Sequence, residues 1–279
     1  MARYSPTNLV LQPPSVIALL AAGKPVVQLG IRNARTAEII RMASGAGYDL
    51  IWIDLEHSSM SIDCAALLAA TTTDLGMISW VRVPEREYGV IGRLLDCGTS
   101  GIISPKIETA QAARLAVDAC RFPPLGQRSA IAILPQYGYV RMPAAELNSR
   151  ANNDVVLQVL LESAEGIANV DEIAAVPGVD ILGIGTNDLS ADLGCPGDVD
   201  NPMMRAAYEK VAAAARRHGK VAVIGGIADA ARWGELLALG FAPLVFAGID
   251  TDLVAGVLSQ KRSEWRERLA SALASTGVE

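Results

Sequence analysis

The chain has 279 residues, of which 51% are hydrophobic, and its formal net charge at pH 7 is −6. This length and composition fit one large domain whose core needs no disulfides. The acidic balance, with a pI near 5.1, argues against a nucleic-acid partner, which would need clustered Lys and Arg. A small anionic substrate would need a local Arg or a metal ion against this background.

Short apolar runs rich in β-branched residues alternate with longer segments of helical period. Eight strands are predicted, in chain order, at Pro25–Ile31, Leu50–Leu55, Ile78–Val83, Gly101–Ile107, Val155–Leu161, Ile181–Gly185, Lys220–Ile224 and Pro243–Ala247. Helices are predicted between them, for example at Thr36–Ser44, Tyr88–Cys97, Ala110–Cys120, Met203–His218 and Ala228–Leu239. Glycines placed just before the next strand, as at Gly98, Gly219 and Gly240, are typical helix C-caps.

Eight strand–helix units in one chain of this length predict an α/β protein with a (β/α)₈ TIM barrel fold, formed by residues 1–279 as a single domain. The apolar runs lack strict alternation, which indicates strands buried on both faces. An open, doubly wound sheet is the alternative. That fold would place a Gly-rich phosphate turn after the first strand, and Gly30-Ile31-Arg32-Asn33 is not one.

Two segments fall outside the regular alternation. The stretch Phe122–Asn153 is long enough to form a lid or rim, and its Tyr137, Tyr139 and Arg141 are candidates, with Lys106, for lining an acceptor pocket. Residues 251–274 predict a long C-terminal helix. This helix either reaches a neighbouring subunit or presents a solvated face.

The cysteine spacing, the N-terminal residues and the lengths of the apolar stretches together predict the cellular location. The four cysteines have no CxxC spacing and suit reduced thiols. The N-terminal residues do not form a basic region followed by a long apolar run, so no secretory signal is predicted. No uncharged apolar stretch reaches the length of about 18 residues expected of a membrane span. We therefore expect a cytoplasmic protein with no membrane partner.

Charged side chains gather at the C-terminal ends of the predicted strands, where barrel enzymes carry out their chemistry. Strand by strand they are Asp54, Glu56 and His57, then Arg82, then Lys106 and Glu108, then Glu162, then Asp188. Glu162 and Asp188 follow adjacent strands and suit a hard divalent ion with oxygen ligands, with water and substrate oxygens completing its shell. The alternative is a helix N-cap for Asp188 and a rim salt bridge for Glu162.

His57 and Arg82 are the other two candidates for chemistry. His57 follows a buried strand that carries two carboxylates, so an acid/base role is plausible, with a plain rim hydrogen bond as the alternative. The guanidinium of Arg82 suits a carboxylate or a developing enolate oxygen. A salt bridge to Asp54 or Glu56 is the structural alternative.

Several motifs resemble the HpcH/HpaI aldolases, metal-dependent and pyruvate-specific enzymes related to the citrate lyase β-subunit. The resemblance covers roughly residues 20 to 255. It is carried by Asp54-Leu55-Glu56-His57, Val81-Arg82-Val83-Pro84, Leu94-Leu95-Asp96-Cys97-Gly98, Arg121-Phe122-Pro123-Pro124-Leu125-Gly126-Gln127-Arg128, Glu162-Ser163 and the run from Gly183 to Gly194.

The resemblance implies a role for each matching residue. Glu162 and Asp188 would hold Mg²⁺ or Mn²⁺, with Co²⁺ as a further candidate. Arg82 would bind the pyruvyl oxygen and stabilise the enolate. His57, with Asp54 behind it, would act as acid and base through a metal-bound water. Asp96 would enter a neighbouring subunit's site.

The resemblance also implies substrate contacts and an assembly. Backbone N–H groups from Gly185 through Thr186 to Asn187 would bind the substrate carboxylate. The expected assembly is a homo-oligomer, a trimer or a hexamer, with an exchanged last helix.

The chain departs from the family pattern at several positions. Gly-Pro-Ala before the metal Asp is replaced by Gly185-Thr186-Asn187, and the usual Gln two residues before the metal Glu is Leu160. Lys106 lies in a segment closer to the CoA-ester lyase relatives. The added polar groups at Thr186, Asn187 and Lys106 suggest a different or larger acidic substrate.

The resulting functional prediction is a metal-dependent aldolase, a carbon–carbon lyase that cleaves or forms 4-hydroxy-2-oxo acids through a pyruvate enolate, with a 2-oxo acid and an aldehyde as its small-molecule partners. Four alternatives stay open at this point. They are an oxaloacetate decarboxylase or other enolate-transfer enzyme at the same site, a CoA-ester lyase, a Schiff-base aldolase that uses Lys106, and a non-catalytic small-acid binder.

Overall fold

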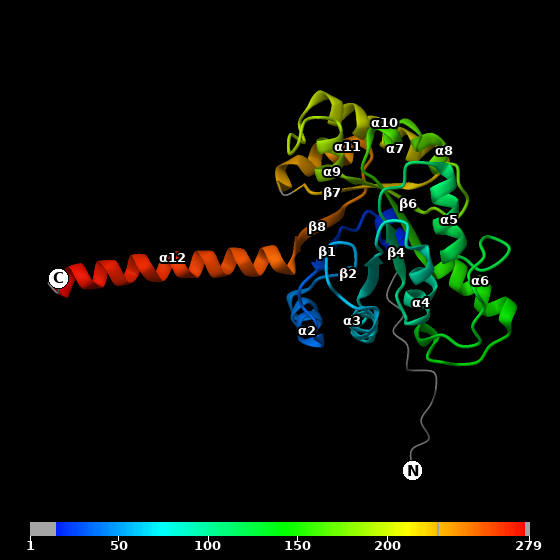
Figure 1. The fold of residues 1–279 in the computed structure, drawn as a ribbon, viewed down its shortest axis with the longest axis horizontal. Helices are drawn as coiled ribbons and strands as arrows, with labels where there is room; N and C mark the ends of the chain where they lie inside the picture. Colours follow the sequence, from blue (N-terminus) through cyan, green and yellow to red (C-terminus); the bar gives the residue numbers. More distant parts are fainter. Residues whose placement is uncertain (1–14, 228, 277–279) are drawn as a thin grey trace, which may run out of the picture.

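The computed structural model describes residues 15–227 and 229–276. Its centre is an eight-stranded parallel sheet in the order β7-β6-β5-β4-β3-β2-β1-β8, curved into a nearly closed barrel (Figure 1). The strands are β1 Val26–Ile31, β2 Leu50–Asp54, β3 Ile78–Arg82, β4 Gly101–Ser104, β5 Val156–Leu161, β6 Ile181–Gly185, β7 Val221–Gly225 and β8 Leu244–Ile249. The predicted TIM barrel is confirmed.

Helices connect the strands and surround the barrel (Figure 1). They are α1 Val16–Ala21, α2 Ala37–Ala46, α3 Ile62–Asp74, α4 Ile91–Asp96, α5 Ala110–Cys120, α6 Ala144–Asp154, α7 Ala164–Ala168, α8 Val170–Ala174, α9 Thr186–Asp192, α10 Pro202–His218, α11 Trp233–Leu239 and α12 Asp250–Thr276. Short 3₁₀ turns occur at η2 Tyr88–Val90, η3 Pro135–Tyr137 and η4 Ala230–Arg232. Side-chain caps begin several helices, as where the Ser61 hydroxyl accepts the N–H of Cys64.

Alternating side chains divide the apolar residues into two cores. Leu50 and Trp52 of β2 point into the barrel, whereas Ile51 and Ile53 point outward against the helices. Both faces of each strand are covered. The strand sequences are therefore continuously apolar and do not alternate between apolar and polar residues. The barrel interior is therefore a packed core, and an open site can form only toward its ends.

The barrel is incomplete between β7 and β8. A single parallel bridge, Ala222 to Phe241, joins the two sides among the described residues, with a hydrogen bond of 2.8 Å from Ala242 N to Ala222 O. On its other edge, β8 forms a ladder with β1. Among the described residues, β8 therefore forms no ladder on its β7 side.

Some predicted boundaries are wrong. The fourth strand ends at Ser104 and not at Ile107, because Pro105 has no N–H to donate and Lys106 adopts a positive φ of 50°. The predicted helix Tyr88–Cys97 is divided into η2 and α4. Of the predicted helix Ala228–Leu239, the first residue lies outside the described part of the chain, and α11 begins only at Trp233.

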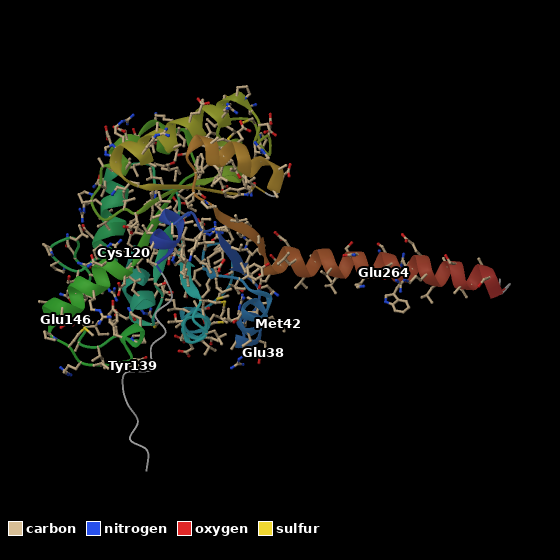
Figure 2. The ribbon with its side chains drawn as sticks, turned by 180° about the vertical axis from the view of Figure 1, so that it is seen from behind. Glu38, Met42, Cys120, Tyr139, Glu146 and Glu264 are labelled. Carbon is tan, nitrogen blue, oxygen red and sulfur yellow. The ribbon has the colours of Figure 1, made fainter. Side chains whose placement is uncertain are left out.

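The C-terminal helix α12 leaves the barrel altogether (Figures 1 and 2). Beyond its first turn, its described side chains project away from the rest of the chain, as around Glu264 (Figure 2), and Leu258 and Trp265 are more than half exposed. None of the helices in the described residues is both long and apolar enough to cross a membrane. The absence of a signal peptide was predicted from N-terminal residues, of which positions 1–14 lie outside the described part of the chain.

Candidate active site

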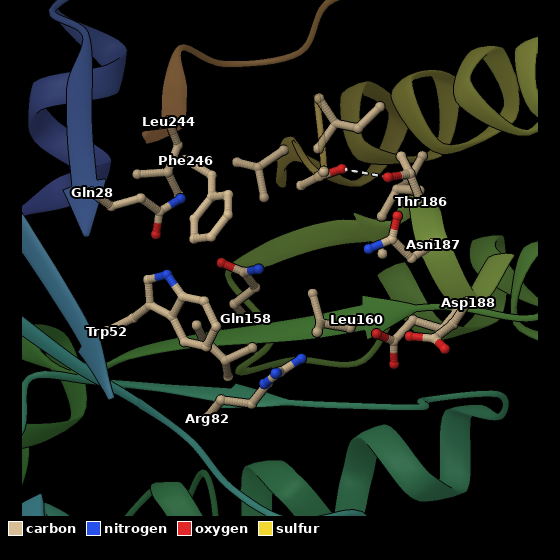
Figure 3. A pocket seen from close by; sticks show the side chains of 18 residues that line it. Gln28, Trp52, Arg82, Gln158, Leu160, Thr186, Asn187, Asp188, Leu244 and Phe246 are labelled. Atoms are coloured by element: carbon tan, nitrogen blue, oxygen red, sulfur yellow. Dashed lines mark hydrogen bonds between the residues drawn. The ribbon is translucent and has the colours of Figure 1, made fainter. Parts of the chain in front are cut away.

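A cavity of about 150 Å³ extends into the barrel from the C-terminal ends of the strands (Figure 3). Charged side chains lie at its mouth and apolar ones farther in. Its lining includes Gln28, Trp52, Arg82, Gln158, Leu160, Glu162, Gly185, Thr186, Asn187 and Asp188. Three of the residues predicted from strand-end charge, Arg82, Glu162 and Asp188, therefore come together in one place.

Glu162 and Asp188 form the acidic side of the cavity. Glu162 directly follows β5 and is 6% exposed, whereas Asp188 lies in the first turn of α9 and is exposed. Glu162 Oε2 accepts a hydrogen bond of 2.8 Å from the backbone N–H of Lys106. Burial, together with the nearby charges of Glu56 and Asp188, raises the pKa of Glu162 to about 7.

This pair fits a divalent cation. A buried carboxylate with a raised pKa beside another carboxylate is relieved of repulsion by a positive ion, and both groups supply the oxygen ligands that Mg²⁺ and Mn²⁺ prefer. Within residues 15–227 and 229–276, no group of three or more His, Cys, Asp or Glu side chains is arranged to hold a metal. Water and substrate oxygens would therefore have to fill the remaining positions.

The backbone of β6 leaves room for the Glu162 side chain. A Cβ atom at Gly185 would lie 2.5 Å from Glu162 Oε1, far inside contact distance. Glycine at this position allows the carboxylate to lie directly over the end of β6. The position of the Glu162 carboxylate therefore depends on glycine at position 185.

Arg82 is held in place by Asp54. Arg82 Nε lies 3.0 Å from Asp54 Oδ1 and Nη2 lies 2.7 Å from Oδ2, while Nη1 lies 3.2 Å from a carboxylate oxygen of Glu56. Burial alone would raise the pKa of Asp54, but the Arg82 and Arg32 guanidiniums and backbone N–H groups outweigh it, so the pKa is lowered. The guanidinium also lies 5.0 Å above the ring centre of Trp52. Arg82 is therefore fixed, charged and directed into the cavity (Figure 3).

His57 lies on the loop after β2, with its side chain about half exposed. Asp54 Oδ1 accepts the backbone N–H of His57 at 3.2 Å. The carboxylate nearest to the ring is that of Glu56, whose Oε2 is 3.8 Å from His57 Nε2. Asp54 therefore binds the backbone N–H of His57. The family resemblance implies instead that Asp54 supports the imidazole ring of His57.

The Gly185-Thr186-Asn187 turn joins β6 to α9. The Thr186 hydroxyl donates to Gly225 O at 2.8 Å, so it ties β6 to β7 (Figure 3). The Asn187 side chain is exposed at the cavity. A substrate contact by Thr186 would therefore use its backbone N–H.

Four predicted site residues do not line the cavity, namely Asp54, His57, Lys106 and Asp96. Strand β4 ends at Ser104, so the expectation that Lys106 belongs to a barrel strand is wrong. Lys106 Nζ is half exposed and lies 3.5 Å from Glu85. Its backbone N–H, and not its amine, contacts Glu162. Asp96, the last residue of α4, accepts a hydrogen bond of 2.7 Å from the buried Arg128 and is about one third exposed.

The long segment Phe122–Asn153 lies away from the cavity mouth. It connects α5 to β5, and Tyr137 is buried with its hydroxyl 2.7 Å from Asp154, just before β5 begins. Glu162 marks the other end of the same strand. Tyr137 therefore lies at the opposite end of the barrel from the acidic pair, and its prediction as an acceptor-pocket residue is wrong.

The amide side chains inside the barrel are not among the site residues predicted from the sequence. Gln158 is 7% exposed and its Oε1 has no hydrogen-bond partner among the described residues. It shares the inward face of β5 with Leu160 and Glu162, and Gln28 lines the same cavity from β1 (Figure 3). The period-two spacing 158, 160, 162 could have identified Gln158.

Comparisons with known proteins agree with this geometry. Residues 32–255 match the family model described as HpcH/HpaI aldolase/citrate lyase. The chain is 40% identical over 211 residues to 4-hydroxy-4-methyl-2-oxoglutarate aldolase tasA of Hapsidospora irregularis, covering 74% of this chain and 77% of that protein. It is 34% identical over 245 residues to 4-hydroxy-2-oxo-heptane-1,7-dioate aldolase of Escherichia coli, covering 85% and 89%.

A solved structure with the same fold supports the assignment. The HpcH/HpaI aldolase from Desulfitobacterium hafniense DCB-2 superposes with a TM-score of 0.83 at 29% identity, covering 91% of this chain and 97% of that one. The sequence match, the fold and the arrangement of the acidic pair beside Arg82 are mutually consistent. The chain belongs to the HpcH/HpaI aldolase/citrate lyase family.

Proposed function

We propose that this carbon–carbon lyase is a metal-dependent aldolase that cleaves and forms 4-hydroxy-2-oxo acids through a pyruvate enolate. The aldolase class follows from the family and its named relatives. The observation that carries the proposal is that the Glu162–Asp188 pair and the fixed guanidinium of Arg82 line one cavity; Asp188 and Arg82 are labelled in Figure 3. Such a site stabilises negative charge that develops on a 2-oxo acid.

Glu162 and Asp188 are the residues that would hold Mg²⁺ or Mn²⁺, with Co²⁺ as a further candidate. The bound ion would supply a Lewis acid for the substrate's oxygens. Gly185 contributes by leaving space for Glu162, and the backbone N–H of Lys106 orients one of its oxygens. The hydrogen bond from Lys106 orients the carboxylate before any ligand arrives.

Arg82 binds the 2-oxo group and stabilises the enolate oxygen when the C3–C4 bond breaks. A guanidinium that is already oriented needs no reorganisation during the reaction. Electrostatic stabilisation of the developing charge is strong because of this preorganisation. Asp54 provides that orientation through two hydrogen bonds. Asp54 is thus a positioning residue for Arg82.

His57 transfers the proton of the substrate's C4 hydroxyl. It accepts that proton, directly or through water, when the bond is cleaved and returns it in synthesis. Its half-exposed ring and the adjacent Glu56 carboxylate suit a group that exchanges protons with solvent. Backbone N–H groups from Gly185 to Asn187 bind the substrate carboxylate, and Asp96 acts at a neighbouring subunit's site.

We also infer an oligomer in which α12 packs on a second copy of the chain. In a TIM barrel each strand's outer face is covered by a helix, but α12 departs from β8 and leaves a hollow of about 600 Å³ beside Trp233 and Val245. The helix itself exposes apolar side chains at Leu253, Val254, Val257, Leu258, Trp265, Leu269 and Leu273. An isolated helix with this surface is stabilised only by packing.

Light scattering after gel filtration tests this assembly. The wild type should be a trimer or hexamer, and Leu258→Glu should dissociate it. Gln260→Glu, a polar position on the same helix, serves as the matched control and should keep the oligomer. A monomeric wild type would refute the exchange of α12.

Pyruvate release tests the aldolase function. Purified protein is incubated with 4-hydroxy-2-oxo acids and with oxaloacetate, in EDTA and with added Mg²⁺ or Mn²⁺. The proposal predicts metal-dependent pyruvate from the hydroxy acids. Cleavage that resists EDTA, or activity on oxaloacetate alone, would overturn it.

A further inference from the structure

A second arginine, Arg32, lies in the same layer as Arg82. It directly follows β1, and the β1–β2 register that pairs Ile31 with Ile53 brings Arg32 beside Asp54. The next ladder pairs Asp54 with Arg82. Three adjacent strands therefore present a guanidinium, a carboxylate and another guanidinium at the mouth of the barrel.

Arg32 contributes only one hydrogen bond to Asp54. Arg82 already binds both of its oxygens, at 3.0 and 2.7 Å, and Arg32 adds only its Nε, 3.0 Å from Oδ2. The Arg32 side chain is 33% exposed, against 10% for Arg82. The two terminal nitrogens of Arg32 have no hydrogen-bond partner among the described residues. Arg32 thus keeps one edge of its planar donor group free at the rim.

The loop that carries Arg32 is held from two sides. The carboxylate of Asp250, 4% exposed at the start of α12, accepts the backbone N–H groups of Arg32, Asn33 and Ala34 at 2.6 to 3.1 Å. On the other side, Arg35 Nη1 donates to the carbonyl oxygens of Arg32 and Asn33 at 2.9 and 2.6 Å. Because the backbone of this loop is already held by hydrogen bonds, little further backbone entropy is lost when the Arg32 side chain binds a ligand.

We infer that Arg32 binds a second carboxylate of the substrate, so that the site selects 2-oxo acids that carry a carboxylate at each end. A free guanidinium edge matches a carboxylate with two parallel hydrogen bonds, and lysine cannot reproduce that geometry. The 2-oxo end lies at Arg82 and the acidic pair, and the distal carboxylate lies at Arg32. This inference rests on the proposed function for the position of the 2-oxo end.

Binding of two inert analogues separates this role from a structural one. 2-Oxoglutarate and 2-oxopentanoate have the same chain length, and only the first has a distal carboxylate. Calorimetry with Mg²⁺ present should show tighter binding of the diacid to the wild type. In Arg32→Met the ratio of the two affinities should fall about 10- to 100-fold, the effect of losing one hydrogen-bonded charge contact, and Arg32→Lys should restore only part of it. Arg41→Met, an exposed arginine of α2, should leave the ratio as in the wild type.

The outcomes distinguish the inference from the proposed function. Equal affinities for the two analogues in the wild type, or an unchanged ratio in Arg32→Met, would overturn the role of Arg32. A loss of affinity that is the same for both analogues would show that Arg32 only supports Asp54, and would also overturn it. Failure to cleave any 4-hydroxy-2-oxo acid would overturn the aldolase while the binding comparison stays readable.

Discussion

Asp54 and Arg82 form a two-point ion pair between neighbouring strands, with Nε to Oδ1 at 3.0 Å and Nη2 to Oδ2 at 2.7 Å. They occupy paired positions at the ends of β2 and β3. Asp54 is completely buried and Arg82 nearly so. A buried charge that loses its partner is costly, so this pair links the stability of the barrel to the geometry of the site.

Replacing Asp54 with Asn should destabilise the protein and slow catalysis together. The amide would place an N–H group against the guanidinium and leave Arg82 without its main counter-charge. We expect the free energy of unfolding to fall by about 3 kcal/mol, measured by urea unfolding at pH 7.5, with a lower kcat. Glu209→Gln, in an exposed ion pair with Arg205, should leave stability almost unchanged, because solvent screens such a pair. Equal effects of the two substitutions would contradict the importance of this pair.

Arg82→Lys should reduce kcat by about 100-fold, the cost of removing one fixed donor from a developing oxyanion. Lysine keeps the positive charge but cannot bind both oxygens of Asp54 and the substrate at once. The measurement is steady-state pyruvate release at saturating metal and substrate. A higher KM with an unchanged kcat would show that Arg82 serves binding alone.

Removal of metal should make stability depend on pH through Glu162. Burial, with the charges of Glu56 and Asp188, raises the pKa of Glu162 from 4.5 to about 7. The folded chain then holds this proton more tightly than the unfolded chain, so metal-free protein loses stability as pH rises from about 4.5 to about 7, by at most about 3 kcal/mol. Melting temperatures in EDTA across this range would measure the loss.

Two controls belong to this pH experiment. Glu162→Gln has no proton to release and should flatten the pH dependence, whereas Glu165→Gln, an exposed residue of α7, should not. Added Mg²⁺ should raise the melting temperature of the wild type more at pH 8 than at pH 6, because only the deprotonated carboxylate binds it well. A Glu162→Gln variant with the wild-type pH profile would contradict the assignment.

Gly185→Ala should weaken metal binding. Its new Cβ would lie 2.5 Å from Glu162 Oε1 and displace the carboxylate. A shift in a ligand's position commonly costs at least about tenfold in metal affinity, which titration calorimetry would measure. Gly225→Ala on β7 is a matched control, because its Cβ would meet only Ile184 O at 3.6 Å. Equal affinity in the two variants would show that Glu162 has room to move.

The sequence alone determined the barrel and the set of charges at its mouth. Apolar runs in β-branched segments and the regular helix–strand alternation predict eight parallel strands. Arg82 and Glu162 stand at predicted strand ends, and Asp188 follows another within three residues. Both features are local, because the hydrophobic pattern of a strand and the position of its end depend on residues close in sequence. They predict the location of the candidate site without knowledge of any tertiary contact.

Only the tertiary structure decided which charges meet. Arg32 reaches Asp54 across 22 residues, and Asp250 holds the Arg32 loop across 218. Lys106 turns away from the site after Pro105, and Tyr137 lies at the other end of the barrel from Glu162. Hydrogen-bond register between strands and the packing of distant segments set these pairings, and neither is encoded in the local pattern of any one segment.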